Sequence, residues 1–91
     1  MHRLDLFRNT LASVDALRDR FPDDRALEQV AIQLCYLIDL EAGNRSDRRH
    51  LENVNVGILT VREVEPLDEG LATLLFRVAE EVESMKSRPT H

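Results

Sequence analysis

The sequence has 91 residues, with 17 acidic side chains against 12 Lys and Arg, and a formal net charge of −5. A chain of this length predicts a single domain over residues 1–91 with room for one hydrophobic core. The negative charge argues against nucleic acid as a ligand, because contacts to its backbone are made by clustered Lys and Arg. No apolar run approaches the roughly 18 residues of a membrane span, and the N-terminus has no signal-peptide core, so we expect a cytoplasmic protein without membrane contact.

Two long helices are predicted in the first half of the chain. Between residues 3 and 20 apolar positions recur at intervals of three or four, which is typical of an amphipathic helix. Pro22 ends this helix, because the residue before a proline disfavours the α region. Asp23 or Asp24 can then cap a second helix that runs to about Glu41.

The second helix is predicted to lie in the middle of the fold. From Gln29 to Ile38 it has no charged residue, and its apolar residues cover nearly the whole circumference. A helix of this kind is usually packed on several sides. Cys35 lies in this stretch and is interpreted as a small buried hydrophobe, since a single cysteine forms no intrachain disulfide. Gly43 is suited to the left-handed cap that ends the helix.

Two further helices are predicted in the second half. The third runs from about Asp47 to Val64, and Gly57 beside its apolar stripe indicates a close approach by another helix. After Pro66, Asp68 reads as the N-cap of a fourth helix from about Glu69 to Lys86. The apolar positions that should face the core are Leu51, Val54, Ile58 and Val61 on the third helix and Leu71, Leu74, Leu75, Val78 and Val82 on the fourth.

The fold class follows from these four elements. Amphipathic helices joined by short connections favour antiparallel neighbours. No segment alternates in the manner of a half-buried strand. We therefore expect an all-α fold, a small antiparallel bundle of about four helices, with a frayed tail at 87–91.

Apolar side chains that the predicted core does not use mark a candidate partner surface. They point away from the core stripes of the third and fourth helices, with acidic and polar residues around them. An apolar centre with an acidic rim is typical of protein-binding surfaces, although a broad core or single exposed residues would also explain the pattern. The partner-binding residues assigned in this way are Glu52, Asn55, Val56, Leu59, Glu63, Glu69 and Phe76.

Catalytic, metal and cofactor sites are not indicated. His2, His50 and His91 have no metal-ligand spacing with one another or with Cys35, and there is no glycine-rich phosphate loop. Nothing places a nucleophile beside a base. The basic cluster at 45–50 lacks interleaved aromatic residues and is interpreted as a solvated helix start. We predict that the protein is not an enzyme and uses no cofactor.

One stretch carries a pattern that extends beyond composition and spacing. An apolar–glycine pair is followed by apolar, basic and acidic positions, namely Val56, Gly57, Val61, Arg62, Glu63, Val64, Glu65, Asp68 and Leu71. The stretch resembles small all-helical immunity proteins of bacterial competition. These neutralise type VI secretion effectors that attack nucleotides, such as NAD(P)+ glycohydrolase toxins and a related adenosine-nucleotide pyrophosphokinase toxin. Pro66, Leu67 and Gly70 depart from the pattern and leave the toxin's identity open.

The resemblance implies inhibition by a bound protein, with no chemistry on this chain. It implies that a helical surface covers the toxin's nucleotide-binding cleft. It also implies that Glu63, Glu65 and Asp68 pair with basic residues that normally hold substrate phosphates, which adds Glu65 and Asp68 to the partner-binding set. The leading prediction is therefore an immunity protein with a cognate toxin as partner. The alternative is a self-associating helical module, a homodimer through the apolar residues of the same surface.

Overall fold

The computed structural model describes residues 2–87 of the protein, without the side chains of Val61 and Ser87. Expectations for the tail at 88–91 and for the side chain of Val61 fall outside this part of the chain. The described residues form helices and no strand, which confirms the all-α bundle. The elements in chain order are α1 (Arg3–Arg20), α2 (Arg25–Ala42), the 3₁₀ helix η1 (Arg49–Asn53), α3 (Val56–Leu59), the π-helix η2 (Thr60–Val64) and α4 (Glu69–Ser87).

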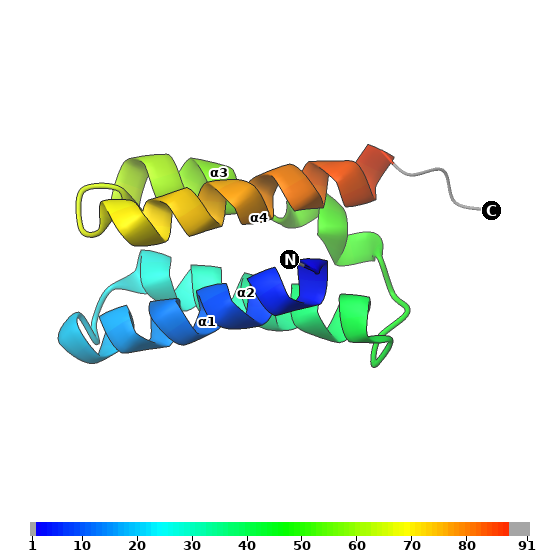
Figure 1. Ribbon diagram of the computed structural model, residues 1–91, viewed down its shortest axis with the longest axis horizontal. Coiled ribbons are helices and arrows are strands. Elements are labelled where there is room, and N and C mark those ends of the chain that lie inside the picture. Colours follow the sequence, from blue (N-terminus) through cyan, green and yellow to red (C-terminus); the bar gives the residue numbers. More distant parts are fainter. Residues whose placement is uncertain (1, 88–91) are drawn as a thin grey trace.

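The helices form two layers (Figure 1). One layer holds α1 and α2, and the other holds α4 with the run from η1 to η2. Helices within a layer are antiparallel, as predicted, and contacts between α1 and α4 and between α2 and α3 join the layers. The hydrophobic core lies between the layers. Its fully buried residues are Phe7, Val14, Leu27, Val30, Leu34, Leu37, Val56, Val64, Leu75 and Val78.

The ends of α2 are fixed by the two caps that the sequence predicts. The Asp24 carboxylate accepts a hydrogen bond from the backbone N–H of Leu27 at 3.1 Å, so it satisfies one of the free amides of the first turn. At the other end Gly43 has φ 83°, a left-handed conformation that glycine adopts without strain.

Arg3 fastens the start of α1 to two other helices. Its Nε donates to Glu81 of α4 at 2.7 Å, and an Nη donates to Glu41 of α2 at 3.4 Å. The hydrogen bond to Glu81 is the main cause that raises the pKa of the Arg3 guanidinium above its ordinary value. One side chain thereby joins both layers at the end where α1 begins.

The prediction that α2 is packed nearly all round is wrong. Ile32 is 53% exposed and Cys35 is also exposed, so one side of the helix faces solvent. The physical reason is the two-layer architecture, in which α2 packs against α1 within its layer and against α3 and η2 in the other layer. The cysteine therefore does not fill a gap in the core.

The prediction of one continuous third helix is also wrong. After η1 the chain extends at Val54 (φ −70°, ψ 120°), and Asn55 (φ −126°, ψ 35°) stands before α3. The helix then widens into η2, where the N–H of Glu65 donates to the carbonyl of Thr60, five residues earlier, at 2.8 Å. The segment therefore has three different helical geometries.

This change of geometry reverses the orientation of two side chains. Val56, expected to point outward to a partner, is 1% exposed in the core, and Ile58, expected in the core, is 60% exposed. An angle of 100° per residue describes side-chain directions only along an unbroken α-helix. The extended residue and the 3₁₀ turn before α3 rotate its apolar face, so the assigned faces do not hold.

Two contacts hold the interrupted segment in place. The Gln33 side chain of α2 donates to Oδ1 of Asn55 at 2.7 Å and accepts from the Asn55 backbone N–H at 3.0 Å. On the other side, a Cβ placed on Gly57 would lie 3.4 Å from the Cβ of Ala79 in α4. Gly57 therefore packs against α4, but at a distance that is ordinary van der Waals contact for a Cβ, so the predicted close backbone approach is not seen.

We predict that Leu34→Ala lowers the free energy of unfolding by about 2–5 kcal/mol, because the side chain is fully buried and its loss leaves a cavity. Ile32→Ala on the same helix is the matched control and should cost less than about 0.5 kcal/mol, since it removes an exposed side chain. Chemical denaturation of both variants measures these values. A loss below about 1 kcal/mol for Leu34→Ala would contradict the assigned core.

Candidate partner-binding surface

Two connections that are distant in the sequence meet at one end of the bundle. The chain passes from α1 to α2 through residues 21–24 and from η2 to α4 through residues 65–68, and both turns lie at the left of Figure 1. We name the surface formed by residues 19–28 and 62–69 the acidic end. It carries three bases, Arg20, Arg25 and Arg62, and eight acids, Asp19, Asp23, Asp24, Glu28, Glu63, Glu65, Asp68 and Glu69.

The acidic end accounts for the whole net charge of the protein. Eight acids and three bases give −5, which equals the formal net charge of the full sequence. Acids and bases therefore balance over the remaining residues. The bundle is therefore electrostatically polarised along its length. The sequence alone does not reveal this, because the acids lie in two segments that are far apart in the chain.

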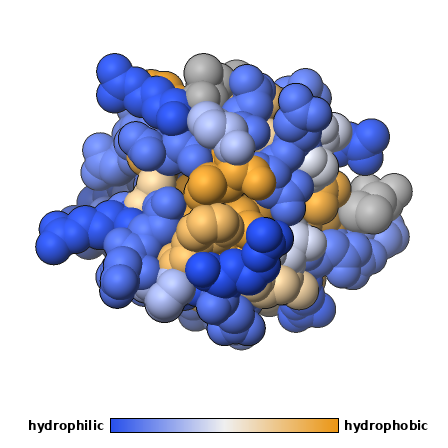
Figure 2. All heavy atoms as spheres, turned by 90° about the vertical axis from the view of Figure 1, so that its left-hand side faces the viewer, coloured by the Kyte–Doolittle hydropathy of each residue, from blue (hydrophilic) through white to orange (hydrophobic). Residues whose placement is uncertain are grey.

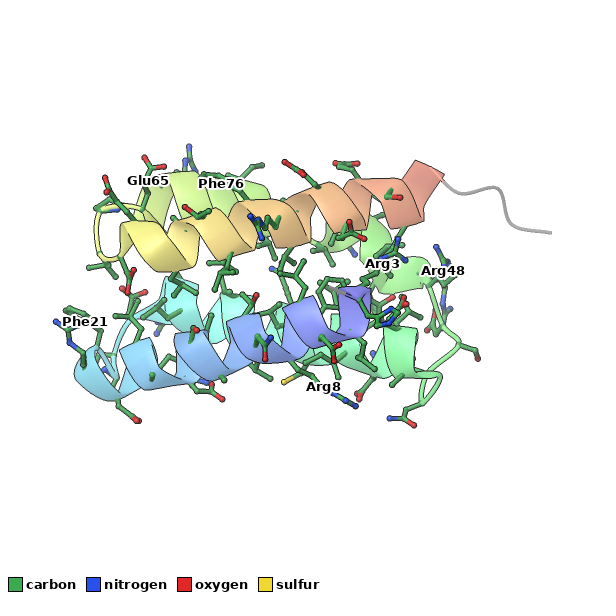
Figure 3. All side chains as sticks on the ribbon, viewed as in Figure 1. Arg3, Arg8, Phe21, Arg48, Glu65 and Phe76 are labelled. Carbon is green, nitrogen blue, oxygen red and sulfur yellow. The ribbon has the colours of Figure 1, made fainter. Side chains whose placement is uncertain are left out.

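The middle of the acidic end is apolar. Figure 2 views the molecule from this side and shows apolar side chains surrounded by a hydrophilic rim. Phe21 and Leu67, one from each connection, are half-buried and pack against the core. Figure 3 shows Phe21 at this end, and the guanidinium carbon of Arg20 lies 5.5 Å from the centre of its ring. This is the anatomy of a protein-binding surface.

Part of the predicted partner set lies at or beside the acidic end. Glu63, Glu65 and Glu69 are exposed there, and Asp68 is half-buried between them. Leu59 is half-buried against the core and, with Glu63, lines an open groove of about 430 Å³ that α2 closes on its other side. Whether any of these residues contacts a partner stays a prediction.

The structure does not bring the rest of the predicted set to this end. Glu52 lines a different groove with the last turns of α4, and Asn55 is bonded to Gln33. Val56 is in the core, so its assignment to an exposed surface is wrong. Phe76 is half-buried on α4 and is labelled in Figure 3. The nine residues therefore do not form one continuous surface.

Sequence reasoning missed Phe21 and Leu67 as surface residues. Both lie in connections, where a helical wheel assigns no face. The available signal was an apolar residue next to Pro in each turn, Phe21-Pro22 and Pro66-Leu67, with acids on both sides. This signal predicts a surface only when it is known that the two turns lie at the same end of the bundle.

The basic cluster at 45–50 makes contacts within the protein. Arg48 donates to the carbonyl of Met85 at 2.7 Å, which ties this loop to α4. Arg49 donates through Nε and Nη2 to the carboxylate of Asp47, both at 3.0 Å. These hydrogen bonds lower the pKa of Asp47 to about 2. The contacts give the cluster a structural role in ordering the loop between α2 and η1.

Residues 2–87 contain neither a candidate membrane span nor a candidate metal site. No helix in this range is both long and apolar enough to cross a membrane. No three His, Cys, Asp or Glu side chains in the same range are grouped so that they could hold a metal ion.

Comparison with known proteins gives one family. The model of the Tsi6 family matches residues 2–83, a range that begins before α1 and ends within α4. No curated protein and no solved structure matches the chain. The match therefore covers the acidic end together with most of the core.

Asp68 has a role in the fold that is independent of any partner. Its Oδ1 accepts from the backbone N–H of Leu71 at 3.0 Å and so caps α4, as the sequence predicts. The negative charge is also favourable beside the positive end of the helix dipole. The loss of this side chain would therefore weaken the helix directly.

We predict that Asp68→Ala lowers the free energy of unfolding by about 1 kcal/mol, because it leaves the first-turn amide without its acceptor. Asp68→Asn retains an acceptor oxygen and should cost less, since it removes only the interaction of the charge with the helix dipole. Thermal and chemical denaturation measure both variants. Equal losses for the two would show that the charge, not the hydrogen bond, is what stabilises α4 here.

Proposed function

Because the chain belongs to the Tsi6 family of type VI secretion immunity proteins, we propose that it binds a cognate toxin domain and blocks its active-site cleft. The toxin attacks nucleotides, as an NAD(P)+ glycohydrolase or a related adenosine-nucleotide pyrophosphokinase does. The immunity protein then works in the cytoplasm, where those nucleotides are found. It provides a binding surface and performs no chemistry of its own.

The acidic end is the observation that supports this mode of action. A cleft that binds nucleotides holds their phosphates with Arg and Lys, so its rim is positively charged. A surface with a net charge of −5 is complementary to such a cleft. Complementary charge accelerates encounter and fixes the orientation of docking. Glu63, Glu65 and Glu69 are the exposed carboxylates that we assign to these contacts.

The charges alone do not provide the affinity that an immunity protein needs. Exposed ion pairs contribute only about 0.2–1 kcal/mol each, whereas nanomolar binding corresponds to about −12 kcal/mol. Most of the energy in protein interfaces comes from a few desolvated anchors, among which aromatic residues are enriched. We assign this role to Phe21 and Leu67, the half-buried apolar residues of the two turns at the acidic end.

The alternative, a homodimer through Phe76, Val56 and Leu59, is weakened at one of its three positions. It depended on an apolar seam that included Val56, and this side chain is buried in the core. A measurement of molecular mass by light scattering still accompanies the binding experiments as a control.

The function is tested in two steps. The tagged protein is first used to isolate its effector from the cells that produce it, and the effector is identified by mass spectrometry. The toxin domain is then purified, and its consumption of nicotinamide and adenine nucleotides is titrated with the chain. We expect activity to fall to zero near one equivalent. Full toxin activity in the presence of excess chain would contradict the proposal.

We predict that Glu63→Arg weakens binding of the toxin domain at least tenfold, because it replaces an attraction to the basic cleft by a repulsion. Glu52→Arg is the matched control: it makes the same charge reversal at an exposed glutamate that lies outside the acidic end, and it should change the affinity by less than about twofold. Calorimetric titration measures both. Equal losses would show that net charge matters and the acidic end does not.

A further inference from the structure

The acidic end is the small face of an elongated bundle. The bundle measures 42 × 24 × 22 Å, so each long side is larger than the end. A partner that docks on the acidic end can add to the buried area by covering part of one long side as well. The long sides of the bundle carry several grooves, and these differ in whether they begin at the acidic end.

One groove leads directly away from the acidic end. The open groove between α2 and η2 begins there, between Asp24 and Glu63, and reaches Gln29. Gln29 also lines a second groove, of about 360 Å³, which continues along α2 past Ile32 to Tyr36. The two grooves are neighbours that share Gln29, and we name them together the α2–α3 groove.

The other candidate groove touches the groove of Ile32 at Asn53 and Val54 but extends along α4. It is formed by α3 and the last turns of α4, from Ala79 to Lys86, and its volume is about 320 Å³. Ile58 and Glu52 line it. Since α4 begins at the acidic end and its last turns lie at the opposite end, this groove is not continuous with the acidic end (Figure 1).

The α2–α3 groove has an exposed apolar side chain at its middle. Among the described residues the large hydrophobic side chains that are exposed are Ile32, at 53%, and Ile58, at 60%. Only Ile32 belongs to the α2–α3 groove. An isolated isoleucine on the solvent side of α2 contributes little to the fold, but its burial by a partner would contribute to binding.

Three of the polar side chains around Ile32 are hydrogen-bonded within the protein. Gln33 and Asn55 exchange two hydrogen bonds, at 2.7 and 3.0 Å. The hydroxyl of Tyr36 donates to the carbonyl of Asp47 at 2.9 Å, and the guanidinium carbon of Arg45 lies 5.2 Å from the centre of the Tyr36 ring. The groove is therefore ordered before binding, and a partner that covers it has few side chains to immobilise.

We infer that the toxin domain occupies the α2–α3 groove as well as the acidic end, and that an apolar side chain beside its basic cleft packs on Ile32. This inference rests on the proposed function and extends it to a second contact region. The occupant is a protein surface with two parts. It is positively charged where it meets Glu63 and Asp24, and it is apolar where it meets Ile32, about two helical turns further along α2. Phe21 and Leu67 then lie at one end of the footprint and Ile32 near the other.

The test compares two isoleucine variants that differ in the groove they occupy. We expect Ile32→Arg to weaken binding of the purified toxin domain at least tenfold and Ile58→Arg to change it by less than twofold. Both side chains are exposed, so both variants should keep the melting temperature of the wild type within a few degrees. Calorimetry measures the affinity, circular dichroism the melting, and light scattering the mass.

Three outcomes would overturn the inference. Unchanged affinity for Ile32→Arg would place the footprint elsewhere, and an equal loss for Ile58→Arg would show a nonspecific effect of the added charge. A free protein that is dimeric and becomes monomeric in Ile32→Arg, with toxin binding intact, would assign the groove to a second copy of the chain. The proposed function itself fails only if the wild-type protein does not inhibit the toxin, which the same titration shows.

Discussion

The break in the helical run at Val54 and Asn55 is the constraint on which the rest of the structure depends. It is held by the two hydrogen bonds that Gln33 and Asn55 exchange and by the packing of Gly57 against Ala79. These contacts join the segment to α2 on one side and to α4 on the other. They decide that Val56 faces the core and that the residues after it line the grooves on either side.

Much of the fold could be predicted from the sequence because its signals are local. The bounds of α1, the cap at Asp24, the left-handed Gly43 and the cap at Asp68 follow from residues within a few positions of each feature. The third segment could not be predicted in the same way. Its apolar periodicity fits an α-helix, but tertiary contacts from Gln33 and Ala79 select another geometry. For the same reason the exposure of Cys35 and Ile32 was missed, since hydrophobicity does not reveal how many neighbours a helix has.

The sequence predicted what kind of surface the candidate site is, but only some of the residues that form it. The resemblance in residues 56–75 pointed to an immunity protein, and the family match supports that reading. A hydrophilic rim around an apolar centre is present at this end (Figure 2), and Glu63, Glu65 and Glu69 are exposed there. Phe21 and Leu67 come from two distant turns that fold to the same end. Local patterns cannot show such a meeting. Charge polarisation also emerges only in the fold, because the acids come from two separate segments.

The central claim is that a toxin domain docks on the acidic end and the adjoining side of α2. Amide hydrogen exchange of the chain, measured alone and in complex with its toxin domain, tests this claim most directly because it maps the footprint without any substitution. The account predicts slower exchange in residues 21–33 and 59–69, and unchanged exchange in the first half of α1 and the last turns of α4. Slower exchange confined to those two latter regions would contradict it.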